Sequence, residues 1–379
     1  MGTSKTSVKP TIGICFLSFG INIFAGIEHA LYNLCNGFND NDIDVHIYSG
    51  YLSGDEDKIG NISIYRSFLL PSKLPKGDKT VRSILSLNKT AINEEILEFI
   101  KSKKITHAYI CDPLWGIVQT TEAWKNIDIP MILSFHVLNT KDLLLEATTV
   151  PYHLYTTVSD YLRTQIQTQA KFRNIQVIPN SVEISRYRKE ITPAPSNSPI
   201  IFCNARISPE KGIIYLVNCF PEILKIFSKA ELWLCGGKYP FGNQDSYFFK
   251  IQKAITDHGI TKNVRIMPKL KWDEIPNYIH QATLVVMPSL QETFGIAALE
   301  AMACGKPLVV TNVGNLPSLT KNASIIVKPN SSASLRDGIL KVLQNEELYD
   351  ALSKKGSTLV QKYSNKTVAQ KFVKLIKTV

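Results

Sequence analysis

Short apolar segments alternate with amphipathic segments along the chain, and this alternation is the feature that most restricts the fold. In the first half, the apolar segments have the length of buried strands, and the segments between them have a helical period. Strands are expected at residues 11–17, 43–49, 62–66, 106–111, 130–135, 152–157 and 175–179, and helices near residues 26–38, 80–104, 114–126, 140–148 and 158–169. Such alternation predicts a doubly wound parallel sheet, which binds ligands at the carboxyl ends of its strands.

A boundary between two domains is expected at residues 189–199. This segment contains three prolines and two serines and has no apolar periodicity, which is typical of an extended linker. A chain of 379 residues is also long enough for two domains of ordinary size. We therefore predict an N-terminal domain over residues 1–188 and a C-terminal domain over residues 200–362.

The composition argues against several classes of protein. The net charge is +11, but the longest basic run is residues 101–104, so a nucleic-acid partner is not expected. Residues 1–189 are nearly neutral, and a surface for anionic lipid is not indicated there. The chain has no apolar run long enough to span a membrane and no signal-peptide core, and its seven cysteines are dispersed. These features predict a cytoplasmic protein with buried reduced thiols.

The stretch at residues 287–315 predicts a strand, a loop, a helix and a second strand, the order of a βαβ unit. The helix is expected to begin near Phe294, so the amides of Phe294, Gly295 and Ile296 would lie at its positive end and hold an anion. Glu292 precedes this junction, and Glu300 lies in the second turn of the helix. Two carboxylates beside an anion site suggest a ligand that is negatively charged and rich in hydroxyls, such as a sugar nucleotide.

Two basic residues follow the first strand of the C-terminal domain. Arg206 and Lys211 flank Ser208 and Pro209, which are a good N-cap and a good first helical residue. Cations at a strand end and a helix start can converge outside the sheet and neutralise a diphosphate. The alternative is a pair of solvated basic residues.

Glu292 and Glu300, with FGI between them and LEAMACGKPLVVTNVGN after them, resemble the E-x7-E motif of retaining glycosyltransferases of family 4. The resemblance implies the GT-B architecture, in which two Rossmann-like doubly wound domains face each other across a cleft. It also implies that a C-terminal helix, residues 363–379, crosses back to the first domain. In this family Glu300 would hold the ribose hydroxyls, Glu292 would bind the sugar, and the R-x4-K spacing of Arg206 and Lys211 would serve the donor diphosphate.

The resemblance also gives roles to residues outside this motif. His136 ends a predicted strand where the family has a histidine beside the reacting carbon; the alternative is a hydrogen-bonded structural histidine. Gly26 lies in AGIEH, where the family has a G-G-x-E-R segment over the donor, although the first glycine and the arginine are absent here. Lys269 and Leu270 would contact the base, with Pro268 in place of the usual glycine.

The resulting hypothesis is a retaining, metal-independent hexosyltransferase of cytoplasmic glycan biosynthesis. It would move a hexose from a nucleotide-diphosphate sugar, with a UDP-sugar favoured and GDP-mannose next, to a hydroxyl of a glycan or other acceptor. No cofactor and no metal are expected, because the acidic segments at residues 40–42 and 55–57 lie in polar, loop-like stretches. The alternatives are an inactive partner subunit that binds nucleotide or glycan, and a sugar-nucleotide epimerase on the same scaffold.

Overall fold

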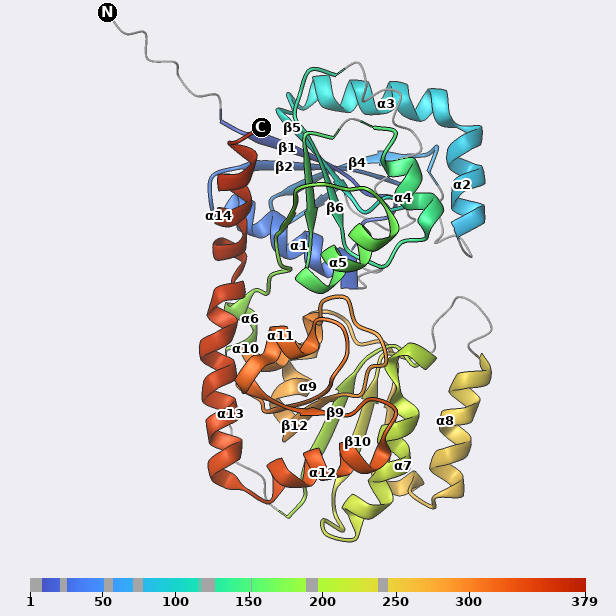
Figure 1. Cartoon of the computed structure of the whole chain (residues 1–379), viewed down its shortest axis with the longest axis vertical. Coiled ribbons are helices and arrows are strands. Elements are labelled where there is room, and N and C mark those ends of the chain that lie inside the picture. The colour runs from blue at the N-terminus through green and yellow to red at the C-terminus, as the bar shows by residue number, and fades with distance from the viewer. Residues whose placement is uncertain are drawn as a thin grey trace, which may run out of the picture. The chain divides into compact units, whose positions relative to one another are not determined.

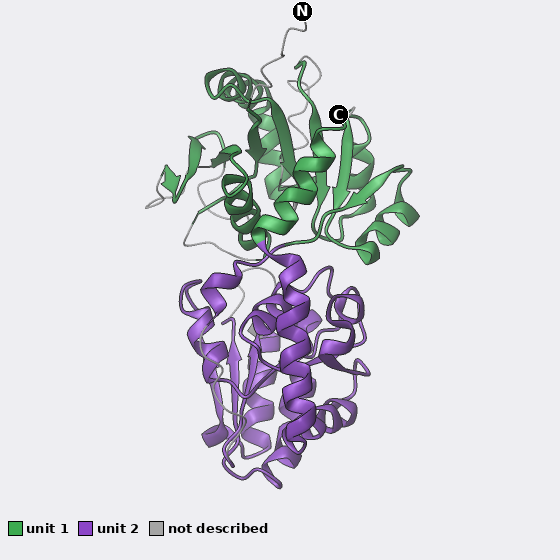
Figure 2. Ribbon diagram, turned by 90° about the vertical axis from the view of Figure 1, so that its left-hand side faces the viewer, with its two compact units in different colours: residues 1–180, 365–379 green, residues 181–364 purple. Residues whose placement is uncertain are grey.

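A computed structural model describes residues 9–20, 26–50, 57–70, 78–115, 117, 127–150, 152–188, 197–237 and 245–379. The chain divides into two compact units, shown in green and purple in Figure 2. Unit 1 contains residues 1–180 and 365–379, and unit 2 contains residues 181–364. Most of the predicted linker, residues 189–196, lies outside the described residues. Residues 181–188 group with unit 2, where the Val182 amide donates to the Tyr363 carbonyl over 2.9 Å.

The described part of unit 1 is built on an eight-stranded sheet with the order β3-β4-β2-β1-β5-β6-β7-β8. Its strands are β1 (Thr11–Cys15), β2 (Asp44–Gly50), β3 (Lys58–Ile59), β4 (Ile62–Ser67), β5 (His107–Cys111), β6 (Met131–Phe135), β7 (Leu154–Thr157) and β8 (Ile175–Val177). All neighbouring strands are parallel except β3 and β4. Parallel neighbours need crossover connections, which here include α1 (Gly26–Asn39), α2 (Asp78–Leu87), α3 (Lys89–Ser102), α4 (Lys141–Ala147) and α5 (Asp160–Gln169). The predicted strands are therefore confirmed.

The segment predicted as one helix near residues 80–104 is two helices, α2 and α3, separated at Asn88. The Asn88 side chain donates to the Ile84 carbonyl over 3.1 Å, a local bond that competes with the helical backbone. The helix predicted at residues 114–126 lies largely outside the described residues.

Unit 2 contains a parallel sheet, for which the described residues give six strands in the order β11-β10-β9-β12-β13-β14. These are β9 (Ile200–Asn204), β10 (Glu231–Cys235), β11 (Val264–Met267), β12 (Leu284–Met287), β13 (Leu308–Thr311) and β14 (Ser324–Val327). The helices are α6 (Ile184–Tyr187), α7 (Ile213–Leu224), α8 (Asp245–Asp257), α9 (Ile275–Gln281), α10 (Ile296–Ala303), α11 (Leu316–Thr320), α12 (Ser332–Leu343) and α13 (Glu346–Leu359). The strand order reverses between β9 and β12, and open α/β sheets bind ligands at such a switch point.

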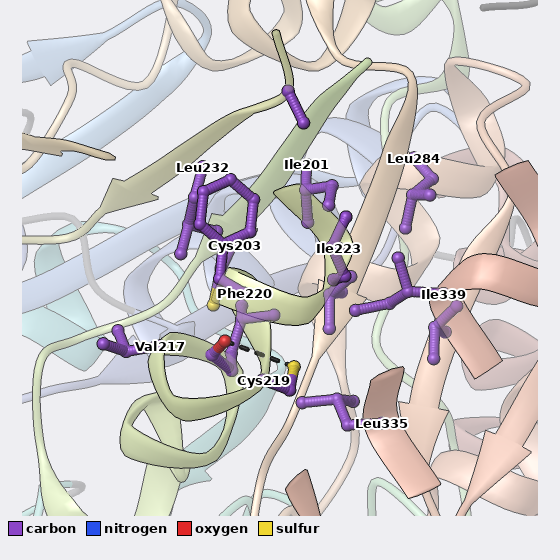
Figure 3. Packing of buried hydrophobic residues seen from close by; sticks show 14 of the residues in the cluster. Ile201, Cys203, Val217, Cys219, Phe220, Ile223, Leu232, Leu284, Leu335 and Ile339 are labelled. Carbon is purple, nitrogen blue, oxygen red and sulfur yellow. Dashed lines mark hydrogen bonds between the residues drawn. The ribbon is translucent and has the colours of Figure 1, made fainter. Parts of the chain in front are cut away.

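The core of unit 2 fixes this sheet against its helices. Figure 3 shows side chains from β9, β10, α7 and α12 that point toward one another, including Ile201, Leu232, Phe220 and Ile339, all of them fully buried. Burial of one such side chain contributes about 1.5–3 kcal/mol. All seven cysteines are buried thiols, as the sequence predicted. The packed sheet is therefore a rigid base for the loops at its carboxyl end.

The C-terminal helix α14 (Asn365–Ile376) belongs to unit 1 and packs against α1, which Figure 1 shows beside it. The Phe372 ring lies 5.2 Å from Phe38 and 5.4 Å from Tyr109. The backbones approach so closely that a Cβ at Gly37 would lie 2.3 Å from the Asn365 carbonyl oxygen. The prediction that a terminal helix returns to the first domain is therefore confirmed. None of the described helices is long and apolar enough to cross a membrane.

Candidate active site

The loop between β12 and α10 forms the centre of the candidate site. The helix begins at Ile296, two residues later than predicted, and Gly295 precedes it with a φ of 106°. An L-residue is strained at this φ, and a Cβ there would also lie 2.8 Å from Leu316 Cδ2. Phe294 therefore lies in the loop, where its carbonyl accepts from the Asn315 side chain over 3.1 Å. The positive end of the α10 dipole still faces this loop.

Glu292 forms an ion pair with Lys211. The Lys211 Nζ lies 2.8 Å from Glu292 Oε2, and the two side chains are only 18% and 14% exposed. They come from the loops that follow the adjacent strands β9 and β12. The pair therefore lies at the switch point of the unit 2 sheet.

These two loops are joined through their backbones. The Glu210 carbonyl accepts from the Leu290 amide over 2.8 Å. A Cβ at Gly212, whose φ is 61°, would lie 2.1 Å from the Pro288 carbonyl oxygen. On the other side, a Cβ at Gly314 would lie 1.8 Å from the Glu292 carbonyl oxygen. Glycine at both positions lets neighbouring loops hold Glu292 in place.

Arg206 binds a different carboxylate from Lys211. Its guanidinium lies 3.3 Å from Glu210 Oε1, and its side chain is 43% exposed. Ser208 occupies the N-cap position before Pro209, as predicted, but its hydroxyl donates to Glu210 Oε1 over 2.5 Å and makes no capping bond to the backbone. The residues after it form only a short 3-10 turn, Pro209–Lys211. The structure thus places both predicted cations at the carboxyl edge of the sheet, each beside a carboxylate.

Glu300 is buried in α10, with 3% of its surface exposed. The Tyr187 hydroxyl donates to its Oε1 over 3.0 Å, and the Asn204 side chain also hydrogen-bonds to it. Burial raises the pKa of the Glu300 carboxyl to about 7, although the bonds from Tyr187 and Asn204 oppose this rise. Burial disfavours the charged form, and donors to the carboxylate favour it.

Leu270 is buried in the loop that follows β11 at the same edge of the sheet. A Cβ at Gly237, after β10, would lie 2.9 Å from the Lys269 amide nitrogen, so the loops after β10 and β11 are in contact. The predicted residues of unit 2 are thus found on one edge of one sheet: Arg206, Lys211, Leu270, Glu292, Phe294, Gly295, Ile296 and Glu300.

Gly26 and His136 belong to unit 1. His136 follows β6 and is 7% exposed, and its Nε2 lies 3.1 Å from the Tyr109 hydroxyl and 3.2 Å from the Ser134 hydroxyl. Burial lowers the pKa of His136 to about 4, so the ring is neutral at pH 7 and supplies one N–H donor. Gly26 is the exposed first residue of α1, and residues 21–25 before it lie outside the described residues.

Sequence reasoning missed three residues beside these groups: Asp112 and Tyr187, which are buried, and Asn204, which is half-buried. Asp112 follows β5, and its Oδ2 accepts from the amides of His136 and Val137 over 3.2 and 3.3 Å and from the Asn139 side chain over 3.1 Å. Burial raises the pKa of Asp112 to about 6. Asp112 and Asn204 each lie at the carboxyl end of a predicted strand, and this position was the available signal for both.

No group of three or more His, Cys, Asp and Glu residues in the described ranges is arranged to hold a metal ion. The two acidic segments of the sequence are residues 40–42 and 55–57. The first follows the end of α1, and residues 55 and 56 of the second lie outside the described residues.

Comparisons with known proteins agree with the fold and the motif. Residues 186–358 match the family described as Glycosyl transferases group 1. An uncharacterized glycosyltransferase of Methanocaldococcus jannaschii is 24% identical over 339 residues, which are 85% of this chain and 86% of that protein. The lipopolysaccharide 1,2-N-acetylglucosaminetransferase of Salmonella typhimurium is 26% identical over 233 residues, 58% of this chain and 60% of that protein.

Solved structures show the same architecture over the whole chain. Sucrose-phosphate synthase from Thermosynechococcus elongatus has a TM-score of 0.82 at 17% identity and covers 98% of this chain and 99% of its own. HepE of Anabaena, in complex with UDP and glucose, has a TM-score of 0.77 at 16% identity. The match covers 98% of this chain and 100% of the HepE chain. The fold of the chain is GT-B, and its residues 186–358 match the group 1 glycosyltransferase family. It is an enzyme that transfers a sugar from a nucleotide sugar.

Proposed function

We propose that the chain is a retaining, metal-independent hexosyltransferase. Its donor would be a nucleotide-diphosphate sugar, with a UDP-sugar first and GDP-mannose second, and its acceptor a hydroxyl of a glycan or other molecule. The observation that carries the proposal is the Lys211–Glu292 ion pair at the switch point of the unit 2 sheet, beside the start of α10. A cation and a carboxylate beside the positive end of a helix suit a ligand that has both phosphates and hydroxyls.

The proposed roles follow from the charge that develops during transfer. When the sugar–phosphate bond breaks, negative charge grows on the leaving diphosphate, and positive charge grows on the reacting carbon. Arg206, Lys211 and the amides at the start of α10 stabilise the diphosphate without reorganising, because loops and helix already hold them. Glu292 binds the sugar hydroxyls, and Glu300 accepts hydrogen bonds from the ribose. Leu270 lies against the base.

The loops of unit 1 would provide the remaining contacts. His136 is neutral because burial lowers its pKa to about 4, so we propose that it donates a hydrogen bond to the sugar near the reacting carbon. Gly26 would lie close to the donor. Retention of anomeric configuration requires that the acceptor attacks from the face that the diphosphate leaves, and we propose that the leaving phosphate accepts the acceptor's proton.

Calorimetric titration of UDP, GDP and ADP with a chelator present tests the donor class. We expect micromolar binding of one nucleotide, and weaker binding to Arg206→Ala. Lys250→Ala is the matched control, because Lys250 is an exposed residue of α8. Binding that requires magnesium would contradict the metal-independent mechanism. A folded protein that binds none of the three nucleotides would favour an inactive partner subunit.

Measurement of nucleotide release from UDP-glucose and GDP-mannose tests the reaction. We expect release to depend on an added acceptor from a panel of glycans, and Glu292→Ala to lose turnover with little change in nucleotide affinity. A Glu292→Ala variant with the wild-type rate would contradict the role of Glu292. Conversion of the donor sugar to an isomer without any acceptor would identify an epimerase instead.

A further inference from the structure

Tyr187 contacts Glu300 although the two residues are 113 positions apart in the sequence. Tyr187 is the last residue of α6 and is 1% exposed. Its hydroxyl donates to Glu300 Oε1 over 3.0 Å, and its carbonyl oxygen accepts from His280 Nε2 over 2.9 Å. Both ends of this tyrosine are therefore fixed, and its hydroxyl points to one carboxylate oxygen.

The neighbouring residue of α6 contacts another part of the candidate site. The Arg186 guanidinium lies over the Trp272 ring, 3.3 Å from its centroid. Trp272 is two residues beyond Leu270, in the loop after β11. Arg186 and Tyr187 thus join α6 both to the loop proposed for the base and to the carboxylate proposed for the ribose.

The surroundings of Glu300 make this hydroxyl important for its charge. The Tyr187 hydroxyl from α6 and Asn204 from the end of β9 hydrogen-bond to the carboxylate, and Arg186 from α6 and the Cys235 thiol from β10 interact with it electrostatically. Burial raises the pKa of Glu300 to about 7, and the Tyr187 bond opposes the rise. A carboxylate accepts from two ribose hydroxyls better than a carboxylic acid does, because the acid uses one oxygen as a donor.

We propose that Tyr187 is a positioning residue for Glu300: its hydroxyl holds Oε1 and keeps the carboxylate ionised and oriented to accept from the ribose hydroxyls of the donor. This inference rests on the proposed function, since it needs Glu300 to bind ribose. Tyr187 itself does not need to touch the donor.

The test compares nucleotides with and without the ribose hydroxyls. Calorimetry measures the affinity of UDP, GDP and their 2′,3′-dideoxy forms for wild type and Tyr187→Phe, between pH 6 and pH 9. Tyr187→Phe removes one oxygen and keeps the buried ring, and circular dichroism checks that the variant folds. The matched control is Tyr349→Phe, because Tyr349 is 3% exposed and donates to the Thr283 carbonyl in the same unit.

We expect wild type to prefer the ribonucleotide and to lose this preference as the pH falls through about 7, where Glu300 becomes protonated. Tyr187→Phe should reduce the preference about tenfold at pH 7.5, which is the effect of one lost hydrogen bond to a charged group. It should also move the midpoint of the pH dependence upward, because a donor that favours the ionised form is gone. Tyr349→Phe should change neither quantity.

The outcomes below would separate a failure of the inference from a failure of the proposed function. A wild-type protein that binds no nucleotide, or binds both forms equally, would contradict the role proposed for Glu300. A wild-type preference for ribose that Tyr187→Phe keeps in full, with the same pH midpoint, would contradict the positioning role of Tyr187 and leave the role of Glu300 intact. A loss of affinity equal for both nucleotide forms would also contradict it, since a purely structural role predicts that result.

Discussion

Glu292 and Glu300 are eight residues apart but occupy different environments. Glu292 is 14% exposed and paired with Lys211, whereas Glu300 is 3% exposed and bound by neutral donors. Sequence reasoning selected both carboxylates and both cations, because each lies after a predicted strand or in the first turns of a predicted helix. It could not assign the Lys211–Glu292 pair, which joins loops 81 positions apart, or the Tyr187 partner of Glu300. These partners depend on how distant segments pack.

The raised pKa of Glu300 predicts a specific effect of pH on stability. The folded state holds the proton up to about pH 7, whereas the ordinary value is 4.5, so the free energy of unfolding falls as the pH rises between these values. One pKa unit corresponds to about 1.4 kcal/mol, so full ionisation costs at most about 3 kcal/mol. Glu300→Gln should therefore gain stability relative to wild type at pH 8 but not at pH 4.5, as urea denaturation would measure.

Asp112 has a raised pKa as well, but it is present in both proteins, so their difference isolates Glu300. An equal difference in stability between Glu300→Gln and wild type at both pH values would contradict the prediction.

The Lys211–Glu292 pair predicts a non-additive effect of two substitutions. Lys211→Met leaves a largely buried carboxylate without its cation, which should cost about 1–3 kcal/mol. Adding Glu292→Gln removes the uncompensated charge, so the double variant should be more stable than Lys211→Met alone, although both should lack transfer activity. Thermal unfolding and nucleotide release measure the two effects. A double variant less stable than either single variant would show that the pair does not couple.

At the scale of elements, the strands were the most predictable part of the chain, because buried parallel strands are short apolar runs. The starts of helices were less predictable. Ser208 has the sequence of an N-cap, but Glu210 takes its hydroxyl. The helix that was predicted to begin at Phe294 begins at Ile296 instead, because Gly295 adopts a left-handed conformation. Local propensity does not contain these competing contacts.

The loop contacts around Glu292 predict the effect of a single methyl group. Gly314→Ala places a Cβ 1.8 Å from the Glu292 carbonyl oxygen, whereas Gly259→Ala, at a similar positive φ, meets nothing within 4 Å. Both substitutions should lose about 1 kcal/mol from backbone strain. Only Gly314→Ala should also displace the loop and weaken nucleotide binding, as thermal unfolding and calorimetry would measure. Equal nucleotide affinities for the two variants would contradict this prediction.

At the scale of the whole molecule, unit 1 is completed by a helix from the far end of the sequence. Phe372 of α14 packs against Phe38 and Tyr109, so Phe372→Ala should destabilise unit 1 by about 3–5 kcal/mol. Hydrogen exchange should become faster in α1 and β5 and remain unchanged in the unit 2 sheet. Phe249→Ala is the control, because Phe249 is 59% exposed. Faster exchange throughout both units would contradict the independence of their cores.

The position of α14 has a consequence for how the chain is made on the ribosome. Domains tend to fold as units while synthesis proceeds from the N-terminus. All the segments of unit 2 leave the ribosome before α14 does, although unit 1 is started first. Residues 181–364 can therefore complete their fold while the partner surface on α1 and β5 is still exposed. A nascent chain that stalls before residue 365 would therefore present this apolar surface to chaperones and proteases.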